Sequence, residues 1–209
     1  ILPLIQKLNE NNKNLNFLIT SSTLSSSKLL KKKINDNKNI VHRFFPIDLE
    51  NISENFLNAW QPDVVCFVDS EIWPNFLFKI KEKNIPLLLI NARLTKRTFK
   101  RWSIVLNFAK QVFNNFDLCL SASEESKNNL NQLKVKKLIY IGNLKYSFQS
   151  IFDELNNTDK KILNNYKTWC AASTHKGEEN IILRTHIEIK KKYKNILTII
   201  IPRHINRSI

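Results

Sequence analysis

Two acidic residues stand close together directly after a short apolar run. Asp69 and Glu71 are two positions apart in the string VDSEIWPN. In a parallel sheet, ligands bind outside the carboxyl ends of the strands, so a carboxylate at such an exit is a candidate catalytic group. The alternative is structural, because Trp73-Pro74-Asn75 opens the next helix and acidic residues stabilise the positive end of a helix. The spacing alone allows both interpretations.

Further polar side chains follow the next apolar runs. Asn91 and Arg93 stand in NARLTKR, where a guanidinium could hold a carboxylate or a phosphate through two hydrogen bonds. An ion pair between Arg93 and one of the two acids is the rival interpretation.

Lys145 follows Gly142 in IYIGNLK. Since the chain has only two glycines, a glycine at this exit indicates a special backbone geometry or the close approach of a ligand.

A second group of polar residues lies near the end of the chain, in AASTHKGEE and IIIPRH. Ser173 and Thr174 are expected to cap a helix that begins near Gly177, which would leave backbone N–H groups free to bind an anion. Arg203 and His204 follow the last apolar run and are expected on the same side. These two segments therefore predict a phosphate pocket.

Several kinds of site are disfavoured by the sequence. Neither a G-x-G-x-x-G nor a G-x-x-x-x-G-K-[ST] string occurs, which argues against dinucleotide and P-loop binding. Cys66, Cys119 and Cys170 each stand alone in an apolar run, without a C-x-x-C pair or a histidine at ligand spacing. We expect three reduced cysteines in the core, no metal site and no cofactor.

The net charge of +15 predicts an anionic partner, whether nucleic acid, a negatively charged lipid surface or a phosphorylated substrate. One predicted helix concentrates cations beside an apolar stripe, and its basic residues are Lys96, Arg97, Lys100, Arg101 and Lys110. Such a stripe usually packs on the core, although a cationic amphipathic helix can also lie on an anionic membrane. No recognised nucleic-acid motif accompanies the charge, so nucleic acid is not expected.

The elements that must position these residues alternate along the chain. Strands are expected at 16–20, 40–45, 63–69, 86–91, 118–121, 138–141, 168–172 and 197–201. Helices are expected at 2–10, 25–34, 53–60, 73–83, 96–113, 124–133, 153–166 and 178–193. Continuous apolar strands that alternate with helices are typical of a parallel sheet covered on both faces. The predicted class is doubly wound α/β.

The strand pattern also indicates how the chain divides. Residues 1–148 are expected to form a first domain, 149–166 a linker helix, and 167–209 the beginning of a second domain. The chain contains no methionine and starts with a helical pattern, so we expect it to lie inside a longer gene product. No apolar run reaches the roughly 18 residues that cross a bilayer, and no signal peptide is visible.

Five strings, in order and at their separations, resemble the Kdo transferases, where Kdo is 3-deoxy-D-manno-octulosonic acid. They are SEIWPN, NARLTKRT, GNLKY, AASTHKGEE and IPRH. Weaker similarity at LPLIQKL, ITSST and FFPIDL extends the match along nearly the whole chain. The resemblance implies a GT-B architecture of two Rossmann-like domains facing across a cleft. The first, which lacks its first strand here, handles the lipid acceptor, and the second binds CMP-Kdo.

The activity implied by this resemblance is the transfer of Kdo from CMP-Kdo to the lipid A precursor, lipid IVA, in lipopolysaccharide synthesis. Transfer would invert the anomeric configuration without a metal, at the cytoplasmic face of the inner membrane of a Gram-negative bacterium. The partners would be the donor, the acceptor and the anionic membrane surface; the oligomeric state is not predicted. Two alternatives stay open: a GT-B transferase for another activated sugar, and a non-catalytic basic module that binds anionic lipid or nucleic acid.

The resemblance also implies residue roles. Asp69, Glu71 and Lys145 match the family's catalytic motifs, in which the first acid and the lysine stabilise the transition state. The family usually has Glu where Asp69 stands. The general base is a Glu in a V-G-E type motif that would precede Ile1, so the chain alone is expected to be inactive. Pro202 and Arg203 match a pair that contacts CMP. The other predicted substrate-binding residues are Asn91, Arg93, Ser173, Thr174, Gly177, Glu178 and His204.

Overall fold

The computed structural model describes residues 1–34, 38–146 and 155–203. The chain forms two compact units, Ile1–Gln149 and Ser150–Ile209. Each is described by itself. No helix within the described ranges combines the length and the apolar run that crossing a membrane requires.

The first unit begins with a two-stranded parallel sheet and two helices. Its elements are α1 (Leu2–Asn11), β1 (Phe17–Ser21), α2 (Leu24–Ile34) and β2 (Ile40–Phe44). Pro3 lies in the first turn of α1, where the N–H that proline lacks would have had no partner within the helix. The four elements share a small core that consists of Ile5, Ile19, Leu30 and Ile40.

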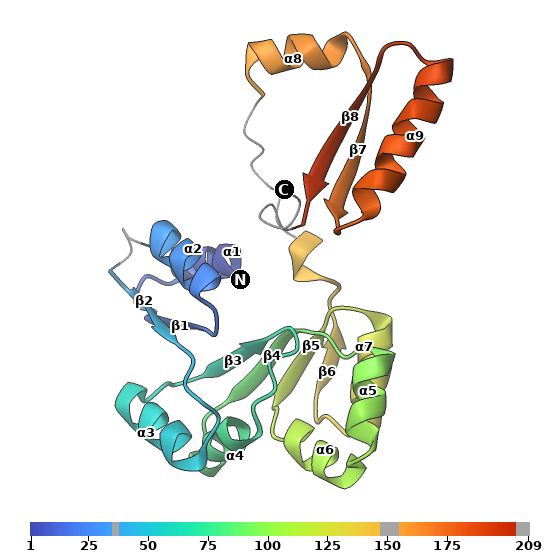
Figure 1. Ribbon diagram of the computed structural model, residues 1–209. Coiled ribbons are helices and arrows are strands. Elements are labelled where there is room, and N and C mark those ends of the chain that lie inside the picture. The colour runs from blue at the N-terminus through green and yellow to red at the C-terminus, as the bar shows by residue number, and fades with distance from the viewer. Residues whose placement is uncertain (35–37, 147–154, 204–209) are drawn as a thin grey trace. The chain divides into compact units, whose positions relative to one another are not determined.

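A four-stranded parallel sheet forms the larger part of the first unit. Its strands are β3 (Val65–Val68), β4 (Leu87–Ala92), β5 (Leu118–Ser121) and β6 (Leu138–Tyr140), in the order β3-β4-β5-β6. Figure 1 shows these strands side by side. Because all of them are parallel, their carboxyl ends lie at one edge of the sheet, which is where the candidate residues of the first unit lie.

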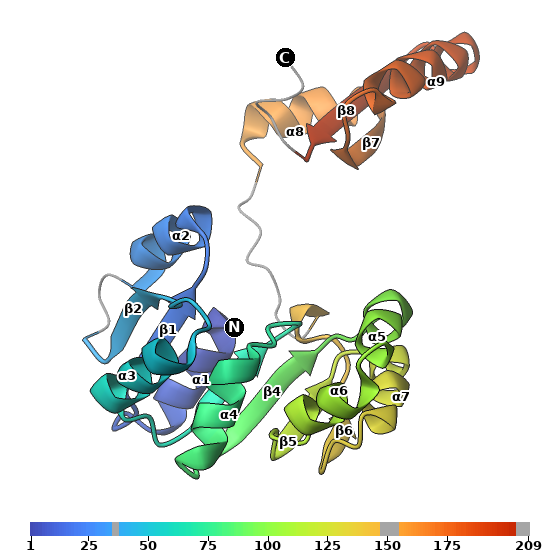
Figure 2. The ribbon, with the colours of Figure 1, turned by 60° about the horizontal axis from the view of Figure 1, so that its bottom comes forward.

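Helices connect these strands and bury their apolar sides in one core. They are α3 (Glu50–Trp60), α4 (Pro74–Glu82), α5 (Lys96–Ser103), α6 (Leu106–Phe113) and α7 (Glu124–Gln132). Leu77 of α4, Leu89 of β4, Phe113 of α6 and Leu130 of α7 belong to the same buried cluster. Figure 2 shows α4 and α6 in front of the strands.

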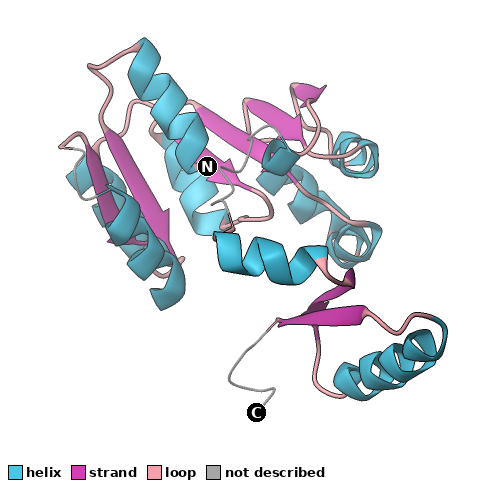
Figure 3. Ribbon diagram, turned by 90° about the horizontal axis from the view of Figure 1, so that it is seen from above, coloured by secondary structure: helices cyan, strands magenta, loops and turns pink. Residues whose placement is uncertain are grey.

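The second unit contains one β-α-β motif. A short 3₁₀ helix, η1 (Leu144–Tyr146), ends the described part of the first unit, and the second contains α8 (Asn157–Asn164), β7 (Lys167–Thr174), α9 (Glu178–Lys192) and β8 (Ile196–Pro202). Figure 3 shows the two strands next to each other with α9 alongside. They pair in parallel, and the His186 ring on α9 is 2.7 Å from the Thr198 hydroxyl on β8. The predicted linker helix falls partly outside the described residues.

The helix predicted over residues 96–113 is two helices, so this prediction was wrong in its length. Helix α5 ends at Ser103, and Val105 leaves the helical conformation with φ −119° and ψ 48°. The Ser103 hydroxyl donates to the Phe99 carbonyl at 2.9 Å, a local bond that tends to bend a helix. The two β-branched residues that follow, Ile104 and Val105, have below-average helix propensity.

The cysteines differ from the prediction that all three lie in the core. Cys119 is buried, and burial raises the pKa of its thiol to about 12. Cys66 and Cys170 are exposed. Successive side chains of a strand point to opposite faces, so the burial of Phe67 turns Cys66 to the other face of the sheet. Cys170 lies on β7 of the two-stranded sheet, where fewer neighbouring strands and helices cover its side chain.

The packing of α4 makes a testable prediction about stability. Leu77 is 0% exposed in the main core, whereas Leu24 on α2 is 72% exposed. We expect Leu77→Ala to lower the free energy of unfolding by about 2–5 kcal/mol, because it leaves a cavity, and the matched control Leu24→Ala to change it by less than about 0.5 kcal/mol. Urea denaturation measures both. Equal losses would contradict the assignment of the core.

Candidate functional site

Two strand exits in the first unit share an uncommon backbone conformation. Asp69, directly after β3, has φ 60°, and Asn91, near the end of β4, has φ 54°. Asp and Asn are the residues, apart from glycine, that tolerate this left-handed region best. The Asp69 N–H donates to the Ile90 carbonyl at 3.0 Å, and the Arg93 N–H donates to the Asp69 carbonyl at 3.1 Å. These two backbone hydrogen bonds hold the ends of β3 and β4 in a fixed position relative to each other.

The side chain of Asn91 joins these exits to a third segment. Its Nδ2 donates a short hydrogen bond to Oδ1 of Asp69, and its Oδ1 accepts from the backbone N–H of Leu144 at 3.0 Å. Asn91 is only 5% exposed, so both bonds are shielded from water. Leu144 immediately precedes Lys145, whose N–H donates to Oδ1 of Asn143 at 3.0 Å. The structure therefore brings Asp69, Asn91 and the Lys145 loop together.

Asp48, rather than Asp69 or Glu71, accepts hydrogen bonds from the backbone at the start of α4. Asp48 accepts from the Phe76 N–H through Oδ1 at 2.9 Å and from the Asn75 N–H through Oδ2 at 3.2 Å. Glu71 is exposed and accepts from the indole N–H of Trp73 at 2.8 Å. Asp48 had no local signal in the sequence, since it lies 28 residues before Phe76. The Asp69 carboxylate does not cap this helix and instead accepts from Asn91.

Arg93 is exposed, and its loop is held in place by α7. Ser126 Oγ accepts from the Leu94 N–H at 3.0 Å, and Asn129 Nδ2 donates to the Leu94 carbonyl at 2.8 Å. Within the described residues, no ion pair joins Arg93 to Asp69 or to any other carboxylate, so the salt-bridge alternative does not hold there. The guanidinium is therefore available to an anionic ligand.

A pocket of about 130 Å³ lies beside Asp69. Asp69, Ser70 and Arg93 supply polar atoms to its wall, while Trp102 and Phe113 supply apolar surface. Ser70 and Trp102 were not among the predicted site residues. The hydroxyl of Ser70 donates to the Arg93 carbonyl at 2.8 Å. Trp102 belongs to the apolar stripe of its helix, and the sequence does not distinguish a pocket wall from ordinary core.

In the second unit, the structure brings the predicted residues of β7 and β8 together. Ser173 has φ 61°, and its Oγ is 3.5 Å from Nη1 of Arg203. The Arg203 N–H donates to the Thr174 carbonyl at 3.0 Å. Thr174 is buried, and its hydroxyl has no hydrogen-bond partner among the described residues. Pro202 ends β8, whereas His204 lies outside the described residues.

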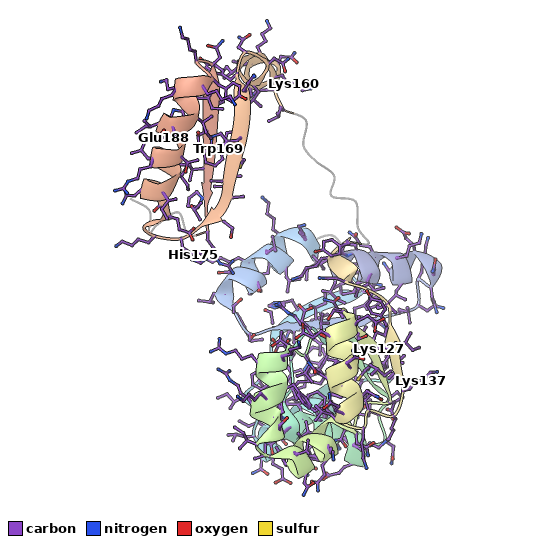
Figure 4. All side chains as sticks on the ribbon, turned by 90° about the vertical axis from the view of Figure 1, so that its right-hand side faces the viewer. Lys127, Lys137, Lys160, Trp169, His175 and Glu188 are labelled. Carbon is purple, nitrogen blue, oxygen red and sulfur yellow. The ribbon has the colours of Figure 1, made fainter. Side chains whose placement is uncertain are left out.

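The expected capping of α9 by Ser173 and Thr174 was wrong. Strand β7 continues through Thr174, and the helix begins after Gly177, which has φ 96°. Instead, Glu178 accepts from the His175 N–H and Glu179 from the Gly177 N–H, each at 2.8 Å. Figure 4 shows His175 at the end of the unit where β7 passes into α9. These two N–H groups already have carboxylate partners, so they are not free for an anion.

Comparison with known proteins gives one family. Residues 1–148 match the family model described as 3-deoxy-D-manno-octulosonic-acid transferase (kdotransferase). A 3-deoxy-D-manno-octulosonic acid transferase of Rickettsia prowazekii is 34% identical over 208 residues, covering 99% of this chain and 44% of the relative. A probable mitochondrial transferase of the same name from Arabidopsis thaliana is 30% identical over 97% of this chain and 47% of the relative. The chain thus spans less than half the length of these relatives.

Similar solved structures include two proteins of low sequence identity. An S. aureus MnaA–UDP structure has a TM-score of 0.54 and 13% identity, covering 92% of this chain and 62% of the other. A putative UDP-N-acetylglucosamine 2-epimerase from Listeria monocytogenes has a TM-score of 0.54 and 12% identity, covering 89% and 62%. At such identities the likeness concerns the fold alone, and it confirms the predicted GT-B type of α/β fold.

The hydrogen bonds of Asp48 predict a loss of stability on substitution. We expect Asp48→Ala to lower the free energy of unfolding by about 0.5–2 kcal/mol, because two N–H groups at the start of α4 lose their acceptor. The matched control is Asp63→Ala, an exposed aspartate without a recorded cap. Thermal denaturation compares the two variants. If Asp48→Ala is as stable as the control, the cap assignment is wrong.

Proposed function

Because the chain belongs to the 3-deoxy-D-manno-octulosonic-acid (Kdo) transferase family, we propose that the protein transfers Kdo from CMP-Kdo to the lipid A precursor of lipopolysaccharide. The observation that carries the proposal is the path of hydrogen bonds from Asp69 through Asn91 to the Lys145 loop. This path links Asp69 to the backbone directly before Lys145, and it supports the role that the family motifs imply for both residues, stabilisation of the transition state. Transfer is proposed to proceed with inversion, without a metal.

The proposed reaction exchanges one bond to the anomeric carbon for another. A general base takes the proton of an acceptor hydroxyl, the hydroxyl oxygen attacks the anomeric carbon of Kdo, and the bond to the CMP phosphate breaks. Positive charge grows on the sugar and negative charge on the departing phosphate. The Asp69 carboxylate stabilises the former and the Lys145 ammonium the latter, in a geometry set before the reaction. Glu71, which accepts from the indole N–H of Trp73, is the third residue that matches the family's catalytic motifs.

The family motifs place the general base before Ile1. We therefore propose that residues 1–209 alone do not catalyse transfer.

For the second unit, we propose binding of the CMP phosphate by Arg203 together with Ser173 and Thr174. The guanidinium lies within 3.5 Å of the Ser173 hydroxyl, and the buried Thr174 hydroxyl has no partner within the described residues. A guanidinium and hydroxyl groups are typical phosphate ligands. The N–H groups of His175 and Gly177, which precede α9, are not proposed as phosphate ligands, because carboxylates already accept from them.

We further propose that the protein works at the cytoplasmic face of the inner membrane, where its lipid acceptor would be anchored. The net charge of +15 supports attraction to a phosphorylated acceptor and to anionic lipid. Nucleic acid is not proposed as a partner.

An assay of the complete protein tests this function. We expect it to release CMP from CMP-Kdo and to attach Kdo to lipid IVA, and we expect no transfer from UDP-N-acetylglucosamine, because the family motifs imply a CMP-sugar donor. Mass spectrometry of the lipid measures the product. Transfer only from the UDP-sugar would overturn the assigned donor, and turnover by residues 1–209 alone would overturn the position of the base.

Substitutions of Asp69 separate its charge from its hydrogen bond. In Asp69→Asn the side-chain oxygen can still accept from Asn91, and asparagine tolerates φ 60°, so only the charge is lost. We expect turnover by the complete enzyme to fall roughly 100-fold while its melting temperature changes little. Asp63→Asn on the exposed surface is the matched control. An Asp69→Asn enzyme with the turnover of the control would contradict the catalytic assignment.

Asp69→Glu tests the reach of the carboxylate, because it introduces the residue that the family usually has. Glutamate tolerates a left-handed backbone less well than aspartate, so its melting temperature is measured in parallel. We expect this variant to retain more activity than Asp69→Asn. A folded Asp69→Glu enzyme that is inactive while Asp69→Asn is active would refute the role carried over from the family.

A further inference from the structure

Both backbone polar groups of Arg93 are bonded to the exit of β3. Its N–H donates to the Asp69 carbonyl at 3.1 Å, and its own carbonyl accepts from the Ser70 hydroxyl at 2.8 Å. Helix α7 holds the next residue of the loop through the buried side chains of Ser126 and Asn129. The point at which the Arg93 side chain leaves the backbone is therefore fixed relative to Asp69.

The side chain of Arg93 is exposed and lines the pocket of about 130 Å³ beside Asp69. In the part of the chain that the structure describes, its guanidinium forms no hydrogen bond, ion pair or ring contact. Arg43, by contrast, donates to the His42 carbonyl at 2.8 Å and lies over the Trp60 ring. An arginine keeps its charge at any physiological pH, so the Arg93 guanidinium is free to bind an anion at this pocket.

The wall of this pocket combines both signs of charge with apolar surface. Asp69 contributes a carboxylate and Arg93 a guanidinium, while Trp102 and Phe113 contribute aromatic rings. Within the described residues the two charged groups form no ion pair with each other. A ligand that suits such a wall carries an anionic group next to a centre that is, or becomes, positive.

We propose that Arg93 binds the carboxylate of the Kdo that is transferred, an inference that rests on the proposed function and names the part of the donor that this pocket recognises. Kdo is an octulosonic acid, and its carboxylate is bonded directly to the anomeric carbon, where positive charge grows. The group that stabilises this charge and the group that binds the carboxylate must therefore lie side by side, as Asp69 and Arg93 do. A planar guanidinium matches a planar carboxylate through two parallel hydrogen bonds.

Electrostatic repulsion gives a second reason for a cation at this position. The Asp69 carboxylate and the sugar carboxylate are both negative, so they repel each other when the donor binds. A guanidinium bonded to the sugar carboxylate offsets this repulsion and leaves the charge of Asp69 for the anomeric carbon. A sugar without the carboxylate provides no such partner for Arg93 and loses these hydrogen bonds. Arg93 thereby selects a sugar acid over a neutral sugar.

A donor analogue with a carboxamide in place of the Kdo carboxylate tests this selection in the complete protein. The carboxamide has nearly the same shape but no charge, so the parent enzyme should use CMP-Kdo roughly 100-fold better, measured as kcat/KM. We expect Arg93→Gln to lower kcat/KM for CMP-Kdo roughly 100-fold and to leave that for the analogue nearly unchanged. Arg93→Lys should lie between, because lysine keeps the charge but not the paired hydrogen bonds.

Two further measurements separate this role from other roles of an exposed arginine. The inhibition constant of CMP, which has no sugar carboxylate, and the KM for lipid IVA should each change less than about twofold in Arg93→Gln. The matched control is Arg184→Gln on the exposed surface of α9, which should keep the parent's preference for CMP-Kdo. We expect both variants to keep the melting temperature of the parent, because each replaces an exposed side chain.

The other outcomes would overturn the assignment. An Arg93→Gln enzyme that prefers CMP-Kdo as strongly as the parent would place the carboxylate elsewhere. A raised KM for lipid IVA with the donor preference intact would assign Arg93 to a phosphate of the acceptor, and weaker inhibition by CMP would assign it to the nucleotide. In each of these cases the parent still transfers Kdo, so the proposed function stands. A parent enzyme that transfers no Kdo would instead overturn the proposed function, and this inference with it.

Discussion

The buried amide of Asn91 is the interaction on which the candidate site in the first unit depends. It donates to Asp69 and accepts from the backbone before Lys145, so one side chain connects the exits of two strands to the loop after a third. A buried amide that loses such a partner incurs the full cost of desolvation. The three segments therefore hold one another in place, and the left-handed conformations of Asp69 and Asn91 persist because these bonds stabilise them.

Separate residues supply the structural and the chemical roles around this amide. Asp48 reaches from a distant loop to cap α4, and Ser126 and Asn129 hold the loop that carries Arg93. Asp69 and Arg93 are thus positioned by neighbours rather than by pairing with each other. A carboxylate and a guanidinium that lie near each other without neutralising each other suit a site that must meet both positive and negative charge.

The cations of α5 differ from several lysines of α4 and α7 in having no carboxylate partner in the part of the chain that the structure describes. Surface lysines on α4 and α7 have carboxylate partners, whereas those of α5 have none within the described residues and end at an exposed aliphatic segment. The break between α5 and α6 creates this arrangement, because it turns Ile104 and Val105 outward instead of continuing the buried stripe. The change of backbone conformation at Val105 thus divides one predicted helix into two.

The sequence by itself determined the α/β class, the approximate place of each strand and of most helices, and the family, which the match over residues 1–148 confirms. These follow from local patterns and from strings of adjacent residues. Local hydrogen bonds that apolar spacing does not show determined the start of α9 and the break between α5 and α6. Only the tertiary structure decided that Asp48 caps α4 and that two cysteines are exposed. The physical reason is that the partner of Asp48 and the burial of each cysteine depend on residues far apart in the chain, which no local spacing records.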